Sequence, residues 1–228
     1  MTLQRRLHGG ALILIMLVAV NQAAQAEGVS GLYVGGSIGI AKFAADNSAY
    51  QTQLQSAVAG FGALDFTSAS LRDRKTAWWV NTGFMAWPFV GIDASYLHLG
   101  ELYNQVTGTF TRNGATPVFV GAATRLRSEG PALGLVFRLP LAEGFDLNLR
   151  LADYYGRTTL TNILNAATYT TTVQTANRSS LLVGLGASYV FLEHWSARLD
   201  YLRVQHAGDS ATGKYNAGML SVGASYTF

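Results

Sequence analysis

The chain of 228 residues contains no cysteine and few charged side chains. Without cysteine, it can form no disulfide scaffold, no thiolate metal site, no cysteine nucleophile and no lipid-anchored cysteine. Charged residues make up 13% of the chain, against about 25% in an ordinary soluble domain. Apolar residues reach 49%, and there are 25 glycines. This composition is unusual for a soluble globular domain.

The first 26 residues have the pattern of a secretory signal peptide. Arg5 and Arg6 precede an apolar run of ten residues, Ala11 to Val20, and Ala24 and Ala26 supply a small-residue cleavage site. The alternative is a membrane anchor, but a helix that spans a bilayer needs about 20 apolar residues. We therefore expect a signal peptide over residues 1–26, cleavage after Ala26 and a single mature domain over residues 27–228.

Removal of the signal peptide also removes most of the basic character. Without Arg5 and Arg6, 14 basic residues face 13 acidic ones, and the basic residues are scattered. A protein that binds nucleic acid is expected to carry a basic stripe. The sequence therefore predicts no nucleic-acid partner.

Beyond residue 26, apolar residues recur with a period of two. In the segment 90–98, Ile92 and Tyr96 share one face while Asp93 and Ser95 share the other. Segments of about ten residues with this alternation are separated in turn by short and long connections, which is typical of a transmembrane β-barrel. We predict an all-β fold, an eight-stranded antiparallel up-and-down transmembrane barrel over residues 27–228.

The connections set the expected orientation. Short turns near Pro88, Leu141 and His194 are assigned to the periplasmic side, and the first and last strands are expected at Leu32–Phe43 and Tyr215–Phe228. Four polar connections are expected as outer loops: Ala44–Arg74, Leu102–Ala123, Arg157–Asn177 and Gln205–Lys214. Asn113-Gly114 is a strong hairpin signal, so the third and fourth strands are expected to extend beyond the membrane.

Four segments resemble a known family: Gly83–Gly100, Arg138–Leu151, His194–Tyr201 and Gly223–Phe228. The sequence resembles the eight-stranded barrels of bacterial outer membranes, namely the transmembrane domain of outer membrane protein A and its small porin-like relatives. The resemblance implies a location in the outer membrane of a Gram-negative bacterium, in contact with membrane lipid and lipopolysaccharide. Full-length members carry a peptidoglycan-binding domain after the barrel, and because this chain stops at Phe228 we do not expect a wall-anchoring role.

The last strand ends in an aromatic residue. Tyr226 and Phe228 alternate with smaller residues in this strand. They resemble the C-terminal signal by which the outer-membrane insertion machinery recognises its clients, so that machinery is an expected partner.

Charged residues recur on the predicted interior face. They are Asp93, Arg138, Asp146, Arg150, Arg198 and Asp200, three of each sign. Because unpaired charges in a narrow lumen would be costly, we expect a network of salt bridges and hydrogen bonds. The network has two interpretations, a plug that fixes the fold or a gated ion path.

Five basic residues are expected just above the outer aromatic girdle, where lipopolysaccharide phosphates lie. They are Lys75, Arg127, Arg157, Arg178 and Arg203. Charge-assisted hydrogen bonds to phosphate are one interpretation, and ordinary solvated charges at the base of the loops are the other.

No enzyme, cofactor or metal site is predicted. Outside the signal peptide the histidines are His98, His194 and His206, which are too scattered to converge. A lipid-modifying enzyme would need His206, Asp209 and Ser210, or the pair His194 and Ser196, in catalytic geometry. We expect instead a structural barrel whose outer loops meet host surfaces or other ligands, with a small-solute or ion channel as the alternative.

Overall fold

The computed structural model describes residues 31–44, 62–72, 74–112, 116, 118–165, 169–209, 212 and 214–228. The predicted signal peptide, Asn113-Gly114 and Ser210 lie outside the described residues. The strands are β1 Leu32–Ala44, β2 Gly62–Arg72, β3 Arg74–Trp87, β4 Val90–Arg112, β5 Val118–Ala142, β6 Phe145–Asn165, β7 Tyr169–Leu192, β8 Trp195–Ala207 and β9 Tyr215–Thr227. Within these ranges, no helix is long and apolar enough to span a bilayer.

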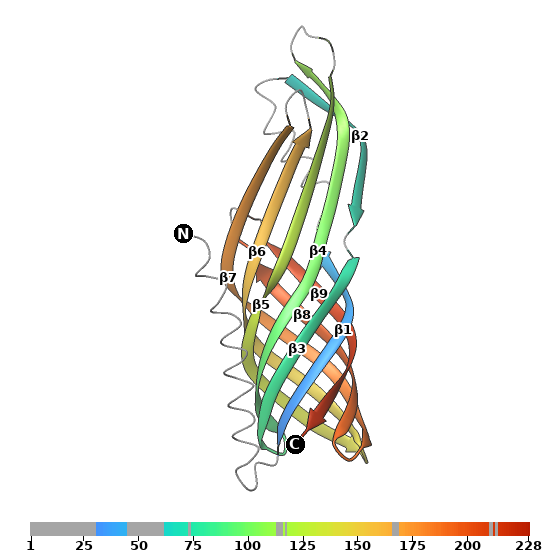
Figure 1. Cartoon of the computed structure of the whole chain (residues 1–228), viewed down its shortest axis with the longest axis vertical. Coiled ribbons are helices and arrows are strands. Elements are labelled where there is room, and N and C mark those ends of the chain that lie inside the picture. Colours follow the sequence, from blue (N-terminus) through green and yellow to red (C-terminus); the bar gives the residue numbers. More distant parts are fainter. Residues whose placement is uncertain are drawn as a thin grey trace.

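The strands form one closed antiparallel barrel (Figure 1). Each strand from β3 to β8 pairs with the next, and β1 closes the ring by pairing with both β3 and β9. β2 is not an additional stave of the barrel. It continues the line of β3 along the same edge of β4, where Arg72 pairs with Tyr103 and Trp78 pairs with His98. Eight strands therefore close the barrel, and the predicted fold class is confirmed.

Short turns join the strands at the end of the barrel where both β1 begins and β9 ends. They connect Trp87 to Val90, Ala142 to Phe145 and Leu192 to Trp195. Gly144 in the second turn has a φ of 73°, a left-handed conformation that glycine adopts without steric strain. We assign this end to the periplasmic side, because outer-membrane barrels have short periplasmic turns.

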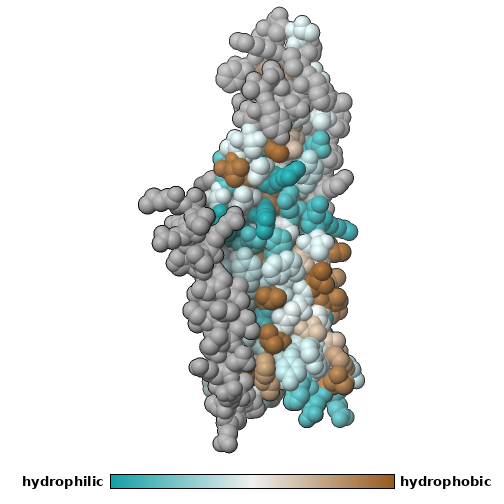
Figure 2. All heavy atoms as spheres, viewed as in Figure 1, coloured by the Kyte–Doolittle hydropathy of each residue, from teal (hydrophilic) through white to brown (hydrophobic). Residues whose placement is uncertain are grey.

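The outward face carries an apolar band. Exposed aliphatic and aromatic side chains from all eight strands form it: Val34, Ile38, Ile40, Val80, Phe84, Ile92, Leu133, Leu135, Leu139, Leu149, Leu151, Leu181, Leu185, Leu199, Leu220 and Val222. Figure 2 shows apolar side chains in the lower half of the molecule, with hydrophilic ones directly above them and at the lower end. Full closure suits such a surface, since no unpaired strand edge faces hydrocarbon.

Aromatic side chains border this band on both sides. Trp87, Phe89, Phe145, Phe191, Trp195 and Phe228 are exposed near the short turns, and Trp78, Tyr155 and Tyr201 are exposed farther along the strands. Trp78 also stacks on Tyr96, with 6.0 Å between ring centroids. This arrangement matches the two interfacial girdles of outer-membrane barrels.

The middle strands extend well beyond the apolar band. β4 pairs with β5 as far as Phe110 and Val118, as the predicted hairpin requires. The outer loop expected over Arg157–Asn177 is wrong in its extent, because β6 and β7 stay paired up to Asn165 and Tyr169. These threonine-rich segments lack apolar alternation because both of their faces meet water. β2 likewise occupies part of the expected loop Ala44–Arg74.

Candidate functional site in the barrel lumen

Four charged side chains lie buried in the lumen. Asp93 comes from β4, Arg150 from β6, and Arg198 and Asp200 from β8. Their side chains are 1%, 4%, 6% and 2% exposed, respectively. Alternation along each strand directs them inward, since their neighbours Ile92, Leu151 and Leu199 face the membrane.

The four charges pair within the lumen. Arg150 Nε lies 3.1 Å from Asp93 Oδ1, and Arg198 Nη2 lies 3.2 Å from Asp200 Oδ2. A longer contact of 3.9 Å joins Arg150 Nη1 to Asp200 Oδ1. Two positive and two negative charges therefore compensate each other across three strands, as a low-dielectric site requires.

Neutral side chains complete this network. The Tyr33 hydroxyl and Asn81 Nδ2 each donate a hydrogen bond of 2.8 Å to Asp93 Oδ2. Arg198 Nη1 donates to Asn81 Oδ1 at 3.1 Å, so Asn81 links the two ion pairs. The inward parity of Tyr33 and Asn81 on their strands is the sequence signal that could have identified them.

The ring of Trp79 lies against both buried arginines. Its ring has the guanidinium carbon of Arg150 at 4.5 Å from the centroid and that of Arg198 at 4.8 Å. Its Nε1 donates to Ser221 Oγ at 3.2 Å. Cation–π attraction at a desolvated site adds to the ion pairing, which fixes both guanidinium groups around one ring.

The other two charges predicted for the interior, Arg138 and Asp146, lie apart from the buried four. Arg138 Nε is 3.8 Å from Asp146 Oδ2, and the side chains are 33% and 16% exposed. Both line a polar cavity of 220 Å³ at the periplasmic end, together with Asn148, Ser188 and Ser196. Arg150 and Arg198 also line this cavity, so the buried network forms one of its walls.

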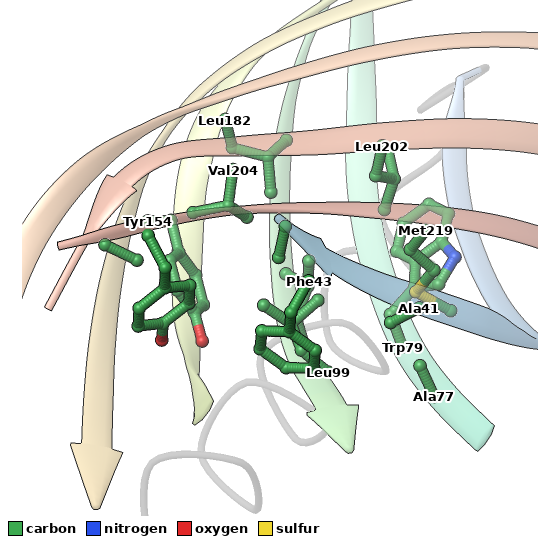
Figure 3. Close-up of a cluster of buried hydrophobic side chains, with 14 of the residues drawn as sticks. Ala41, Phe43, Ala77, Trp79, Leu99, Tyr154, Leu182, Leu202, Val204 and Met219 are labelled. Atoms are coloured by element: carbon green, nitrogen blue, oxygen red, sulfur yellow. The ribbon is translucent and has the colours of Figure 1, made fainter. Parts of the chain in front are cut away.

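An apolar layer fills the lumen on the other side of the network (Figure 3). On β8, Leu202 and Val204 follow Asp200 in the direction away from the turn, and on β4 Leu97 and Leu99 follow Asp93. The layer consists of Phe43, Trp79, Leu97, Leu99, Tyr154, Leu182, Leu202, Val204 and Met219, each 1% exposed or less. Side chains thus fill the interior, as expected for a barrel of eight strands.

The five basic residues expected near lipopolysaccharide do not share one face. Arg127, Arg157 and Arg203 are exposed on the outward side of their strands. Lys75 has the inward parity of Ala77 and Trp79, and Arg178 has the inward parity of Ala176 and Ser180. Arg178 donates to the Gly208 carbonyl at 3.3 Å. Because side chains alternate along a strand, only three of the five lie on the surface that meets lipid.

The residues considered for catalysis make structural contacts. The His206 backbone N–H donates to Asn216 Oδ1 at 2.9 Å, and Asp209 Oδ1 accepts from the Thr212 backbone at 2.9 Å. At the periplasmic turn, the His194 ring lies 5.5 Å from that of Tyr226. Ser196 instead shares a 2.7 Å hydrogen bond with Ser225. No group of three or more potential metal ligands gathers among the described residues.

The C-terminal aromatics lie on the outer surface of the periplasmic rim. Phe228 is 44% exposed, and its ring meets that of Tyr226 edge-on at 5.1 Å. The Phe228 backbone N–H donates to the Leu32 carbonyl at 2.9 Å, which ties the end of the chain to β1.

A closed antiparallel barrel with an apolar outer band and a polar lumen is a transmembrane β-barrel. The family model for the outer membrane protein β-barrel domain matches residues 10–228. The chain belongs to this family, and it is a protein of the Gram-negative cell outer membrane.

One curated relative is outer membrane protein A of Yersinia pseudotuberculosis serotype I (strain IP32953), which is 27% identical over 148 residues. The match covers 64% of this chain and 38% of the relative, so the chain spans well under half of that protein.

Solved structures of similar fold share little sequence with this chain. Ail of Yersinia pestis, in complex with the heparin analogue sucrose octasulfate, is 14% identical with a TM-score of 0.44, covering 87% of this chain and 99% of Ail. OprG from Pseudomonas aeruginosa is 15% identical with a TM-score of 0.42, covering 87% and 96%. The protease OmpT from Escherichia coli is 10% identical with a TM-score of 0.44, covering 88% and 97%. The similarity concerns the fold alone.

Proposed function

We propose that this protein is a non-conducting barrel that anchors a surface-interaction module in the outer membrane. The apolar layer across the lumen carries this proposal. Phe43, Leu99, Leu202 and Met219 are each 1% exposed or less, so they leave no room for a hydrated ion to pass. The polar cavity then ends at this layer and communicates with the periplasm only.

The buried ion pairs act in this proposal as a plug that fixes the fold. Opening a path would require Arg150 and Arg198 to leave their carboxylates and the ring of Trp79. Removing one partner of a buried pair is strongly unfavourable because the other charge stays buried. A gated channel would also need a movement of the apolar layer, which carries no titratable carboxylate or base to trigger it.

The interaction module is the part of the barrel beyond the apolar band. Paired strands continue there to Phe110 and Val118 in one hairpin and to Asn165 and Tyr169 in the other. Such a paired sheet can serve as a scaffold for the loops that connect its strands. In this proposal those loops contact host surfaces or other ligands, since binding residues are often carried by loops on a rigid scaffold.

Lipopolysaccharide is the proposed lipid partner of the outward arginines. Arg127, Arg157 and Arg203 are exposed on the membrane-facing side, and guanidinium groups suit phosphate through charge-assisted hydrogen bonds. Arg127 also pairs with Glu129 at 2.8 Å. The insertion machinery is the proposed partner of Tyr226 and Phe228 during assembly.

Single-channel recording in planar bilayers tests the central part of this proposal. Folded wild-type protein should give no discrete conductance steps. A variant with Phe43→Ala, Leu99→Ala and Met219→Ala opens the apolar layer and should conduct if the layer is the barrier. Steps from the wild type that change in Arg150→Ala would contradict the proposal and favour a gated channel.

A further inference from the structure

A groove outside the barrel combines apolar and polar walls. It crosses β5, β6 and β7, has a volume of 370 Å³ and is lined by leucines around a carboxylate and a hydroxyl. The leucines are Leu133, Leu135, Leu151 and Leu181, which are 41–61% exposed. Asp153 and Ser179 lie between them and hydrogen bond to each other.

Asp153 is an unusual residue for this surface. In the strand register it lies opposite Leu133 of β5 and Leu181 of β7, so apolar side chains flank it on both sides. Ser179 donates one hydrogen bond, but an ionised carboxylate has about four acceptor sites. A charged side chain facing lipid is destabilising unless it finds polar partners. The carboxylate of Asp153 therefore has acceptor sites left for hydrogen-bond donors of a molecule that occupies the groove.

The order of side chains along β6 indicates the chemistry of that molecule. Moving outward from the apolar band, the outward-facing residues are Leu151, Asp153, Tyr155 and Arg157. Glu129, which pairs with Arg157 in register, is engaged by Arg127 at 2.8 Å and by His98 at 3.0 Å. Arg157 has no ion pair among the described residues and is available for an anion.

A matching lipid must offer acyl chains, then hydrogen-bond donors, then a negative charge. A glycerophospholipid presents ester carbonyls just above its chains, and these accept hydrogen bonds but cannot donate them to a carboxylate. An N-acylated sugar presents amide N–H groups and hydroxyls at that position, and its phosphate lies farther out. Of these two arrangements, the second places donors between the acyl chains and the phosphate, in the order that Asp153 and Arg157 require.

We propose that the groove over β5 to β7 binds an N-acylated, phosphorylated sugar lipid of the outer leaflet. The leucines take an acyl chain, Asp153 accepts from an amide or hydroxyl, and Arg157 binds the phosphate. This inference rests on the proposed contact between the outward arginines and lipopolysaccharide. It adds a defined site and a reason for selectivity over ordinary phospholipids.

Native mass spectrometry of the delipidated full chain in detergent can test this site. Diphosphoryl lipid A and phosphatidylglycerol serve as the two probes. Wild-type protein should bind lipid A more tightly, and Asp153→Leu should weaken lipid A binding about fivefold while leaving phosphatidylglycerol unchanged. Thr76→Leu, an exposed outward position on β3, is the matched control and should change neither. Circular dichroism verifies that each variant is folded.

The outcomes distinguish failure of the groove from failure of the proposed contact between the outward arginines and lipopolysaccharide. If Arg157→Gln loses lipid A but Asp153→Leu retains it, the phosphate contact stands and the selective groove is refuted. If neither variant changes lipid A binding, both the groove and the phosphate contact of Arg157 are refuted. Equal affinity of the wild type for the two lipids would also overturn the inference, because the groove would then be a general apolar surface.

Discussion

Truncation of Asp93 is the sharpest perturbation of the lumen network. Asp93→Ala removes the carboxylate that Arg150 approaches at 3.1 Å and that accepts hydrogen bonds from Tyr33 and Asn81. Breaking a buried ion pair from one side costs about 3–5 kcal/mol. In this variant Arg150 still has two partners, the carboxylate of Asp200 at 3.9 Å from its Nη1 and the centroid of the Trp79 ring at 4.5 Å from its guanidinium carbon. We therefore expect the lower end of that range, a loss of about 3 kcal/mol in the free energy of unfolding.

The partly exposed pair at the periplasmic mouth provides the matched control. Asp146 lies 3.8 Å from Arg138, whose side chain is 33% exposed, and exposed pairs contribute about 0–1 kcal/mol. Urea unfolding in phospholipid vesicles, followed by tryptophan fluorescence, measures both Asp93→Ala and Asp146→Ala. Equal losses in the two variants would refute the reasoning. In a further variant, Asp93→Ala with Arg150→Leu should recover part of the stability, because no buried charge is left without its partner.

Three further substitutions test the packing and assembly of the barrel. Gly35→Ala would put a Cβ 2.8 Å from Asn81 Oδ1, and it should lower the free energy of unfolding by about 1–3 kcal/mol. Gly36→Ala is the control in the same unfolding assay. Its Cβ would have the nearest side-chain neighbour at 3.8 Å, so this variant should be nearly neutral. Leu202→Ala opens a cavity in the apolar layer and should lower the free energy of unfolding by about 2–5 kcal/mol. If the loss is no larger than that caused by the lipid-facing Leu185→Ala, the layer is not tightly packed. Phe228→Ala should lower the amount of barrel assembled in cells severalfold while barely changing the unfolding of purified protein, because its ring is 44% exposed; quantitative blotting of outer-membrane fractions compares the two effects.

The sequence was sufficient to predict the eight strands and, within the apolar band, which charged side chains face inward. A strand with one apolar face shows its parity directly, so Asp93, Arg150, Arg198 and Asp200 could be assigned to the interior. Their pairing could not be predicted, because it depends on the register between strands that lie far apart in the chain. The role of Trp79, which holds two guanidinium groups at 4.5 and 4.8 Å, depends on the same register.

Sequence reasoning was weakest beyond the membrane. There both faces of a strand meet water, so the threonine-rich upper halves of β6 and β7 resemble loops by composition. The inward parity of Lys75 and Arg178 could not be predicted for a related reason, since parity is hard to count where the apolar contrast ends. The apolar layer was missed because its residues, among them Phe43, Leu99 and Met219, are dispersed over several strands and meet only in the closed barrel.

Thiol labelling from the two sides of the membrane tests the closed lumen most directly. Because the chain has no cysteine, Ser188→Cys in the periplasmic cavity and Thr175→Cys on the exposed part of β7 are clean single probes. On intact cells, a membrane-impermeant maleimide should label Thr175→Cys and leave Ser188→Cys unreacted. Once the periplasm is opened, Ser188→Cys should react as well. Labelling of Ser188→Cys on intact cells would contradict the account, because it would require a water-filled path through the apolar layer.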